Sequence, residues 1–302
     1  MKLAAIDCGT NTVLLTIAEA VGGTLVPIVE HAEITRLGEG LARSGVLSEP
    51  AIARTVAVFE RYTEMISSHG CERVLAVGTE ALRRASNGAD AVRAIDGVLA
   101  RVHARLEIIA GQREAQLSYD AVRASFPKLM GPRTVVDIGG GSTELIVGDQ
   151  EIEGVISLPI GSVVLTESLL AGDPPTSDER AALLGTIDEK LESAPPLRGT
   201  VVGIAGTVTT FAAIVLGMTD YDATRVHGLR LSLADLEREV ERLGVMRLDD
   251  RRRTPGLQPK RADVIYAGGV ILSRILRRAK ADQCIVSDRG IRWGLLYEAI
   301  AN

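Results

Sequence analysis

The sequence lacks the features that mark secreted, membrane-bound and zinc-binding proteins. Its three cysteines, Cys8, Cys71 and Cys284, show no CxxC or Cys/His spacing, and an odd number argues against a disulfide framework. No apolar run approaches the roughly 18 residues of a membrane helix, and Asp7 interrupts the only candidate for a signal-peptide core. We therefore expect a cytoplasmic protein with reduced thiols and no membrane partner.

A large excess of either charge is also missing. The formal net charge of the 302 residues is −5, which provides no broad basic face, so we expect no nucleic-acid partner. The chain contains no low-complexity segment and no obvious linker. Its length suits two domains of ordinary size, and 46% hydrophobic residues are enough to fill their cores.

The most informative stretch is residues 134 to 148, TVVDIGGGSTELIVG, in which two apolar runs flank an acid, three glycines and two hydroxyls. This pattern predicts a strand, a tight turn and a second strand. The three glycines have no Cβ, so their backbone N–H groups can close on an anion such as phosphate. Asp137 and Glu144 flank the turn, and two carboxylates beside a phosphate require a cation with hard oxygen ligands, such as Mg²⁺. An ordinary glycine-rich hairpin is the alternative interpretation.

A second copy of this plan favours the phosphate interpretation. Residues 5 to 16, AIDCGTNTVLLT, repeat it with Asp7 at the position of Asp137, 137 − 7 = 130 residues earlier. The duplication predicts an α/β protein of two similar lobes that face each other, with a phosphate between the two turns. We place the lobes at 1–118 and 119–302, with the last helix, 289–302, as a segment that could pack back on the first lobe.

Five further residues, at three places in the sequence, are candidate ligand contacts. Arg83 and Arg84 follow a predicted strand, at the sheet edge where α/β proteins bind ligands, although solvated surface charge is the alternative. Glu114 lies in the first turn of a predicted helix, where a carboxylate either complements the helix dipole or takes a proton from water. Gly206 and Thr207 begin another helix, whose N-terminus either binds an anion or packs tightly on its strand.

A cationic stretch lies near the C-terminus of the chain. Residues 251 to 263, RRRTPGLQPKRAD, place five cations around two prolines, which predicts an exposed loop rather than a helix. Such a loop is either a solvated face or a track for the distal phosphates of a long substrate.

Several of these motifs together resemble the exopolyphosphatase/guanosine pentaphosphate phosphohydrolase family of the actin-like ATPase superfamily. The resemblance implies two ribonuclease-H-like lobes with the active site in the cleft between them. It also implies a short, two-domain member, since the sequence ends where longer members continue into an additional helical domain. The matching blocks span nearly the whole chain in the family's order: DCGTNT from Asp7, TEALRRASN from Thr79, GQREA from Gly111, DIGGGSTE from Asp137, VHG from Val226, RAD from Arg261 and SDRGIRWGL from Ser287.

The resemblance assigns roles to individual residues. Glu114 matches the catalytic glutamate that activates water, and Arg83 matches a phosphate-binding arginine. Asp137 and Glu144 match the acids linked to the metal and the attacking water, and Asp7 is the corresponding metal candidate in the first turn. The expected phosphate contacts are Thr10, Asn11, Thr12, Gly139, Gly140, Gly141, Ser142, Thr143, Gly206 and Thr207.

Two positions depart from the family pattern. Arg113 stands where the family often has an acid or amide, which adds a charge beside the proposed base. Val164 stands where the family often has an arginine, which removes a phosphate contact and favours short substrates.

We therefore predict a Mg²⁺-dependent hydrolase, with Mn²⁺ as the alternative ion, that removes the terminal phosphoryl group of inorganic polyphosphate. A homodimer is expected. Guanosine pentaphosphate hydrolysis is the first alternative, because it is the same chemistry on a nucleotide. An acetate-kinase-like or sugar-kinase-like phosphotransferase and a non-catalytic actin-like nucleotide switch are the others.

Overall fold

The computed structural model describes residues 1–301, and the contacts within it divide the chain into two compact units. Unit 1 comprises Met1–Ala124 together with Ile291–Asn302, and unit 2 comprises Ser125–Gly290. Our expectation that the lobes are separate domains with a boundary near residue 118 stays a prediction, and Asn302 of the expected last helix lies outside the described residues. Within residues 1–301, no helix has the length and apolar character needed to span a bilayer.

Unit 1 is built on a mixed sheet with the strand order β3-β2-β1-β4-β5. β1 pairs antiparallel with β2 and parallel with β4, while β2 pairs antiparallel with the edge strand β3. An edge strand tolerates proline, which has no N–H to donate to a neighbouring strand. Pro27 lies on the edge strand β3, opposite a register shift in β2. The strands are β1 (Lys2–Cys8), β2 (Thr12–Val21), β3 (Thr24–Ile34), β4 (Arg73–Gly78) and β5 (Leu106–Ile108).

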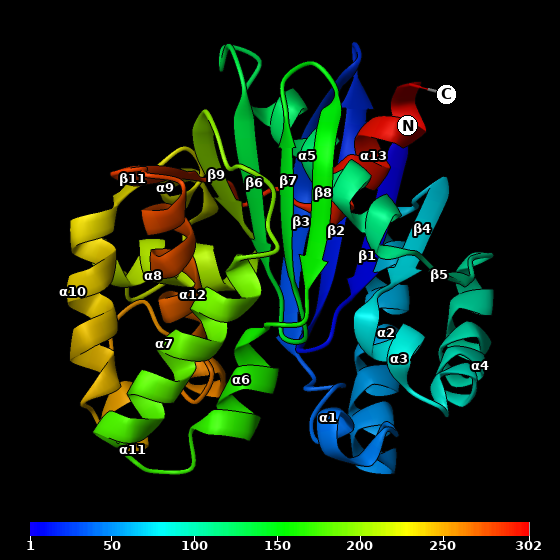
Figure 1. Cartoon of the computed structure of the whole chain (residues 1–302). Helices are drawn as coiled ribbons and strands as arrows, with labels where there is room; N and C mark the ends of the chain where they lie inside the picture. Colours follow the sequence, from blue (N-terminus) through cyan, green and yellow to red (C-terminus); the bar gives the residue numbers. More distant parts are fainter. Residues whose placement is uncertain (302) are drawn as a thin grey trace. The chain divides into compact units, whose positions relative to one another are not determined.

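Helices cover both faces of this sheet. α2 and α4 pack against one face, and α5 and α13 cover the other, where Trp293 of α13 is fully buried (Figure 1). α13 approaches α5 so closely that a Cβ at Gly294 would lie 2.2 Å from the carbonyl oxygen of Leu117. The helices are α1 (Leu41–Ser44), α2 (Glu49–His69), α3 (Glu80–Arg84), α4 (Gly88–Leu99), the 3₁₀ helix η1 (Ala100–Val102), α5 (Gly111–Ser125) and α13 (Ile291–Ala301).

Unit 2 repeats the strand plan of unit 1. Its sheet has the order β8-β7-β6-β9-β11-β10, in which β6 pairs antiparallel with β7 and parallel with β9, as β1 pairs with β2 and β4 in unit 1. β10 extends this sheet by one antiparallel strand beyond the plan of unit 1. The strands are β6 (Arg133–Ile138), β7 (Thr143–Gly148), β8 (Ile152–Leu158), β9 (Thr200–Ile204), β10 (Arg230–Ser232) and β11 (Gln283–Val286).

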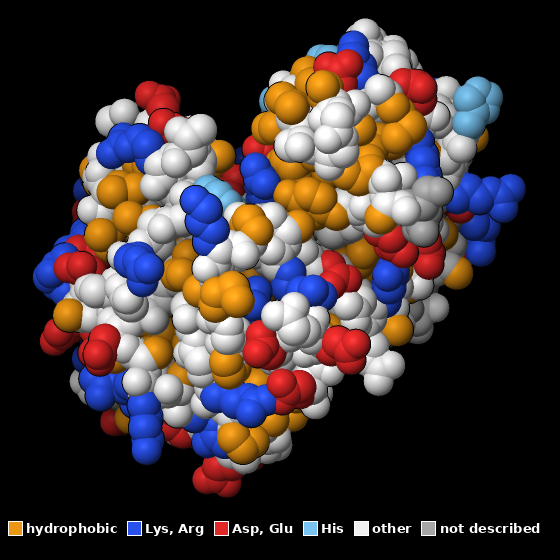
Figure 2. Space-filling view, turned by 90° about the horizontal axis from the view of Figure 1, so that it is seen from above, with side chains coloured by type: hydrophobic (Ala, Val, Ile, Leu, Met, Phe, Trp, Pro, Cys, Tyr) orange, Lys and Arg blue, Asp and Glu red, His pale blue; other side chains and the backbone are white. Residues whose placement is uncertain are grey.

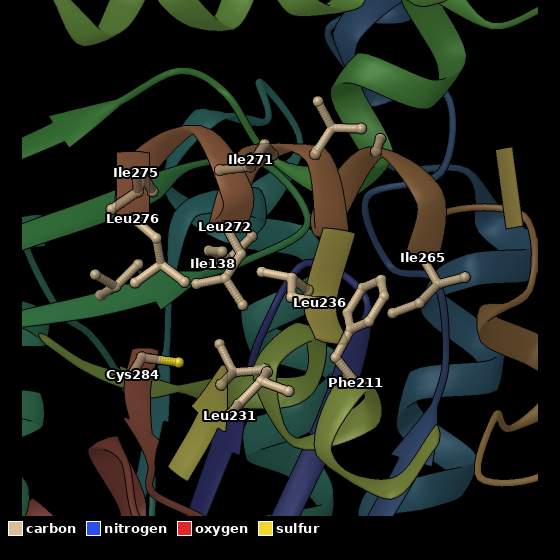
Figure 3. Close-up of a cluster of buried hydrophobic side chains, with 14 of the residues drawn as sticks. Ile138, Phe211, Leu231, Leu236, Ile265, Ile271, Leu272, Ile275, Leu276 and Cys284 are labelled. Carbon is tan, nitrogen blue, oxygen red and sulfur yellow. The ribbon is translucent and has the colours of Figure 1, made fainter. Parts of the chain in front are cut away.

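The core of unit 2 is centred on α12, which packs against α6, α7, α8 and α10. Figure 1 shows α10 and α12 side by side, and in Figure 3 Leu272 and Leu276 of α12 point toward Ile138 of β6. The buried thiol of Cys284 belongs to the same cluster. The helices are α6 (Ser162–Leu169), α7 (Ser177–Leu191), α8 (Ala205–Val215), α9 (Ala223–Val226), α10 (Leu233–Gly244), α11 (Leu248–Arg251), the 3₁₀ helix η2 (Pro259–Arg261) and α12 (Ile265–Arg278).

The 130-residue repeat is preserved in the hydrogen bonding of the two hairpins. In unit 1 the N–H of Gly9 donates to the carbonyl of Thr12 at 3.0 Å, and in unit 2 the N–H of Gly139 donates to the carbonyl of Ser142 at 2.9 Å. The strand register is also the same, because Asp7 lies opposite Leu14 in unit 1 and Asp137 lies opposite Glu144, both 130 residues later, in unit 2. The duplication seen in the sequence is therefore a duplication of structure.

The predicted exposed loop at residues 251 to 263 is wrong in part. Arg251 ends helix α11 and is only 4% exposed, because its Nε donates to the carbonyl of Leu243 at 2.7 Å and its guanidinium lies 5.7 Å from the ring centre of Tyr266. Arg252 and Arg253 are exposed, but each forms an ion pair with an aspartate three residues earlier in the chain. The same interspersion of signs is seen on the face shown in Figure 2, where Lys and Arg alternate with Asp and Glu.

Candidate active site

The turn between β1 and β2 presents backbone N–H groups. Its carbonyl oxygens are already occupied, since Thr10 accepts from the N–H of Gly38 at 2.8 Å and Asn11 accepts from those of Thr35 and Arg36 at 3.0 Å. In the described part of the chain, the N–H groups of Thr10 and Asn11 have no acceptor. A turn whose carbonyls are paired while its N–H groups are available is suited to bind an anion, as the sequence predicts.

The turn between β6 and β7 has the same character. The carbonyls of Gly139 and Gly140 accept from the first N–H groups of α6, and within residues 1–301 the N–H groups of Gly140 and Gly141 have no acceptor. Gly161 permits this arrangement, because a Cβ there would lie 2.2 Å from the oxygen of Gly140. The N–H donors from α6 are Ser162 at 3.0 Å, Val163 at 2.9 Å and Val164 at 3.1 Å.

The hydroxyl residues that flank these turns are largely buried. Thr12 begins β2 and Thr143 begins β7, where the Thr143 hydroxyl donates to the carbonyl of Ile160 at 2.5 Å. Because that hydroxyl is engaged with the backbone, Thr143 holds the turn in place through its side chain. Its predicted contact with phosphate stays a prediction.

Three polar side chains form a row across the sheet of unit 2. The register places Asp137 of β6 opposite Glu144 of β7, and Glu144 opposite Ser157 of β8, so all three lie on one face. Glu144 is 6% exposed, and its Oε1 accepts from the Oγ of Ser142 at 2.7 Å and from the Oγ of Ser157 at 2.6 Å. The two serines therefore hold the Glu144 carboxylate from two sides.

Ser157 is not among the residues predicted from the sequence, because strand β8 was not predicted. The alternating exposure of residues 152 to 158, IEGVISL, is visible only in the structure, since Val155 and Ile156 are adjacent apolar residues in the sequence. The repeat is the signal that could have located the strand, because a shift of 130 residues moves the start of β3 at Thr24 to residue 154, inside β8.

Glu114 lies in the first turn of α5 and is 8% exposed. The Nη1 of Arg83 donates to Glu114 Oε1 at 2.6 Å and to the carbonyl of Ile109 at 2.6 Å. Burial raises the pKa of the Glu114 carboxyl, and the hydrogen bond and charge of Arg83 oppose that rise. A carboxylate with these surroundings is a suitable general base, because its pKa is moved toward the pH at which it must accept a proton.

The neighbouring arginine has a different environment. Arg84 pairs with Glu80 one helical turn away at 3.0 Å, and its side chain is 46% exposed. Of the two alternatives given for these arginines, solvated surface charge describes Arg84, whereas Arg83 contacts the candidate base.

Asp7, at the end of β1, has the properties of a cation ligand. Its Oδ1 is buried without a hydrogen-bond partner in the described part of the chain. Burial, and secondly the charge of Glu114, raise the pKa of Asp7 to about 7, while Arg292 acts in the opposite direction. A divalent cation would compensate such a carboxylate, so the residue fits a metal such as Mg²⁺, which commonly binds one or two carboxylates and retains several waters. No cluster of three His, Cys, Asp or Glu side chains suited to a metal was found in residues 1–301.

The start of α8 combines a helix N-terminus with a half-buried cation. Ala205 adopts φ +65, a left-handed conformation that is uncommon outside glycine, and Gly206 follows it. The guanidinium of Arg261 packs on Gly206, where a Cβ would lie 2.2 Å from its Nη1, and burial lowers the pKa of Arg261 to about 10. The hydroxyl of Thr207 lies 3.5 Å from the carbonyl of Ile138, which favours the packing alternative for this side chain.

Comparison with known proteins decides the family. The model of the Ppx/GppA phosphatase family matches residues 16–302. The chain belongs to the Ppx/GppA phosphatase family. Exopolyphosphatase 2 of Mycobacterium tuberculosis is 37% identical to it over 309 residues, which cover 97% of this chain and 97% of that protein. The recognition of the family from sequence, and with it the prediction of a hydrolase, is confirmed.

Solved structures of this family share the fold. A family member from Aquifex aeolicus is 36% identical, with a TM-score of 0.84 over 100% of this chain and 98% of that one. An exopolyphosphatase from Cytophaga hutchinsonii is 26% identical, with a TM-score of 0.90 over 100% of this chain and 98% of that one. The predicted α/β fold with two ribonuclease-H-like lobes is thereby confirmed. The phosphatase family also suggests dependence on a divalent metal in general, while the roles of individual residues stay predictions.

Proposed function

We propose that the protein is an exopolyphosphatase that releases the terminal phosphoryl group of inorganic polyphosphate, with Mg²⁺ as its ion and Mn²⁺ as a substitute. The observation that carries this proposal is the buried Glu114 carboxylate bound to Arg83, in a chain similar to an exopolyphosphatase over 97% of its length. A buried carboxylate of raised pKa is what activation of water at a phosphoryl group requires.

In the proposed reaction Glu114 takes a proton from the attacking water. The water oxygen forms a bond to the terminal phosphorus, the phosphoanhydride bond breaks, and the shortened polyphosphate leaves with the electron pair. Arg83 keeps the Glu114 carboxylate ionised through its hydrogen bond and carries part of the charge that develops on the phosphoryl oxygens.

The two glycine-containing turns supply the remaining charge stabilisation in this proposal. Their available N–H groups would bind phosphoryl oxygens, a preorganised contribution that is usually the largest in such reactions. Asp7, Asp137 and Glu144 would hold the divalent ion, which when bound would neutralise phosphate oxygens. In this reaction, residues of both units would act on one substrate, as the duplication in the sequence predicts.

Short chains are the proposed substrates. Val164 provides no charge at a position where the family often has arginine. Two of the five cations that could form a track are compensated locally, Arg252 by Asp249 and Arg253 by Asp250. Guanosine pentaphosphate is the alternative substrate, because the family that matches the chain is named Ppx/GppA. The expected homodimer and cytoplasmic location stay predictions.

The test is phosphate release from short polyphosphate, long polyphosphate, guanosine pentaphosphate and ATP, measured side by side. We expect the highest kcat/KM on short polyphosphate and a kcat reduced roughly 10²–10⁴-fold by Glu114→Gln, the usual contribution of a general base. Glu107→Gln is the matched control, because Glu107 is an exposed carboxylate of the same unit and should leave kcat unchanged. A higher kcat/KM on guanosine pentaphosphate would make that nucleotide the substrate in place of polyphosphate. An unchanged kcat in Glu114→Gln would refute Glu114 as the base.

A further inference from the structure

The row Asp137, Glu144 and Ser157 distinguishes unit 2 from unit 1. At the corresponding register positions of unit 1, Asp7 of β1 lies opposite Leu14 of β2, and Leu14 lies opposite Ala32 of β3. The aspartate is therefore common to both copies, whereas the glutamate and the serine are present only in unit 2.

This difference shows that the polar row is not required by the fold. The same strand order and the same hairpin register form in unit 1 with apolar side chains in place of Glu144 and Ser157. A nearly buried carboxylate is unfavourable in a sheet unless hydrogen bonds compensate it. A polar substitution that the architecture does not need is more simply explained by the chemistry of the site.

The hydrogen bonds show how Ser157 could serve that chemistry. Ser142, in the turn before β7, and Ser157, on β8, donate to the same oxygen of Glu144, Oε1. Two donors on one oxygen fix the rotation of the carboxyl group as well as its position. Ser157 itself is exposed, so it lies on the solvent side of a carboxylate that is 6% exposed.

We propose that Ser157 is a positioning residue, which together with Ser142 orients the Glu144 carboxylate for its part in hydrolysis. This inference rests on the proposed function, because it assigns Ser157 no task apart from Glu144. Ser157 forms no bond to the reacting atoms, and its effect reaches the reaction only through the orientation of that carboxylate.

The experiment is a double-mutant cycle on kcat and KM for short polyphosphate, with thermal unfolding as a second measurement. Ser157→Ala should lower kcat about 10- to 100-fold, the range expected for a hydrogen bond to a charged group, with KM changed less than about twofold. Ser157→Thr, which keeps the hydroxyl, should recover most of kcat. Val155→Ala, an exposed change on the same strand, is the control for disturbance of β8 and should leave kcat unchanged.

The decisive comparison is made in a Glu144→Ala background. If Ser157 acts only through Glu144, then Ser157→Ala causes no further loss there, because coupled residues are not additive. An equal loss in both backgrounds, or a wild-type kcat in Ser157→Ala alone, would overturn the inference while leaving the proposed function intact. A wild-type kcat in Glu144→Ala would instead remove Glu144 from the proposed function, and the role of Ser157 with it.

Discussion

The contact between Arg83 and Glu114 allows a sharp test of both residues. The Nη1 of Arg83 donates to the Glu114 carboxylate at 2.6 Å, and the Arg83 side chain is 33% exposed, so part of this side chain reaches solvent. Removing it in Arg83→Ala has two effects that can be measured separately. It deletes a positive charge from the site, and it leaves a buried carboxylate without its cationic partner.

The magnitudes follow from these two effects. A charge-stabilising arginine in phosphoryl transfer contributes about 10³–10⁵ in rate, whereas a solvated arginine contributes little. Loss of the partner should also destabilise the fold by about 1 to 3 kcal/mol, between the values for exposed and fully buried pairs. Because Arg83 lowers the pKa of Glu114, its removal should move the acidic limb of the kcat/KM profile to higher pH.

The assay is phosphate release from short polyphosphate as a function of pH, with thermal unfolding of each variant. Arg84→Ala is the matched control, since Arg84 occupies the next position of the same helix but pairs with Glu80. Arg83→Ala in a Glu114→Gln background separates the two effects: a further loss shows that Arg83 also contacts the phosphoryl group, and no further loss shows that it acts through Glu114. Equal, small losses in Arg83→Ala and Arg84→Ala would refute the assignment.

Three further predictions follow from the described contacts. Gly161→Ala should lower kcat/KM and destabilise the protein by about 1 to 3 kcal/mol, because its Cβ would meet the Gly140 backbone at 2.2 Å; an unchanged thermal transition would contradict this. In protein freed of metal by a chelator, the free energy of unfolding should fall by up to about 4 kcal/mol as pH rises from 3.8 to about 7. The reason is that folded Asp7 retains a proton that the unfolded chain releases. An Asp7→Asn variant with the pH dependence of the wild type would contradict this. Neutralising Arg252 and Arg253 together should leave the dependence of kcat/KM on polyphosphate length unchanged at low and high salt, whereas a loss of preference for long chains would identify a phosphate track.

The parts of the fold that depend on local pattern could be predicted from the sequence. The two hairpins were found because glycines and alternating apolar residues specify a strand, a turn and a strand within about 15 residues. Their equivalence followed from the repeated spacing of Asp7 and Asp137. Strand β8 was not predicted because its apolar residues do not alternate, since Val155 and Ile156 are adjacent, and only the 130-residue repeat indicates it.

The parts that depend on distant partners could not be predicted in the same way. Arg251 was expected in an exposed loop, but its burial depends on the ring of Tyr266 and the carbonyl of Leu243, which only the folded chain brings to it. The contact of Arg83 with Glu114 joins residues 31 apart in the sequence, so no local pattern predicts it. The charge of Arg251 favoured a surface position, whereas Arg83 was predicted as a ligand contact with surface charge as the alternative.

The return of the last helix to the first unit has a consequence for synthesis of the protein. Trp293, Leu295 and Leu296 of α13 complete the core against Leu3 and Ala5 of β1, so unit 1 combines a segment that precedes unit 2 in the sequence with one that follows it. Domains usually fold in the order in which they leave the ribosome. Here unit 2 is a continuous segment that emerges before α13 is made, while β1 must wait for the eleven residues of α13. The apolar surface of β1 that α13 covers therefore stays open in the nascent chain until α13 has been synthesised.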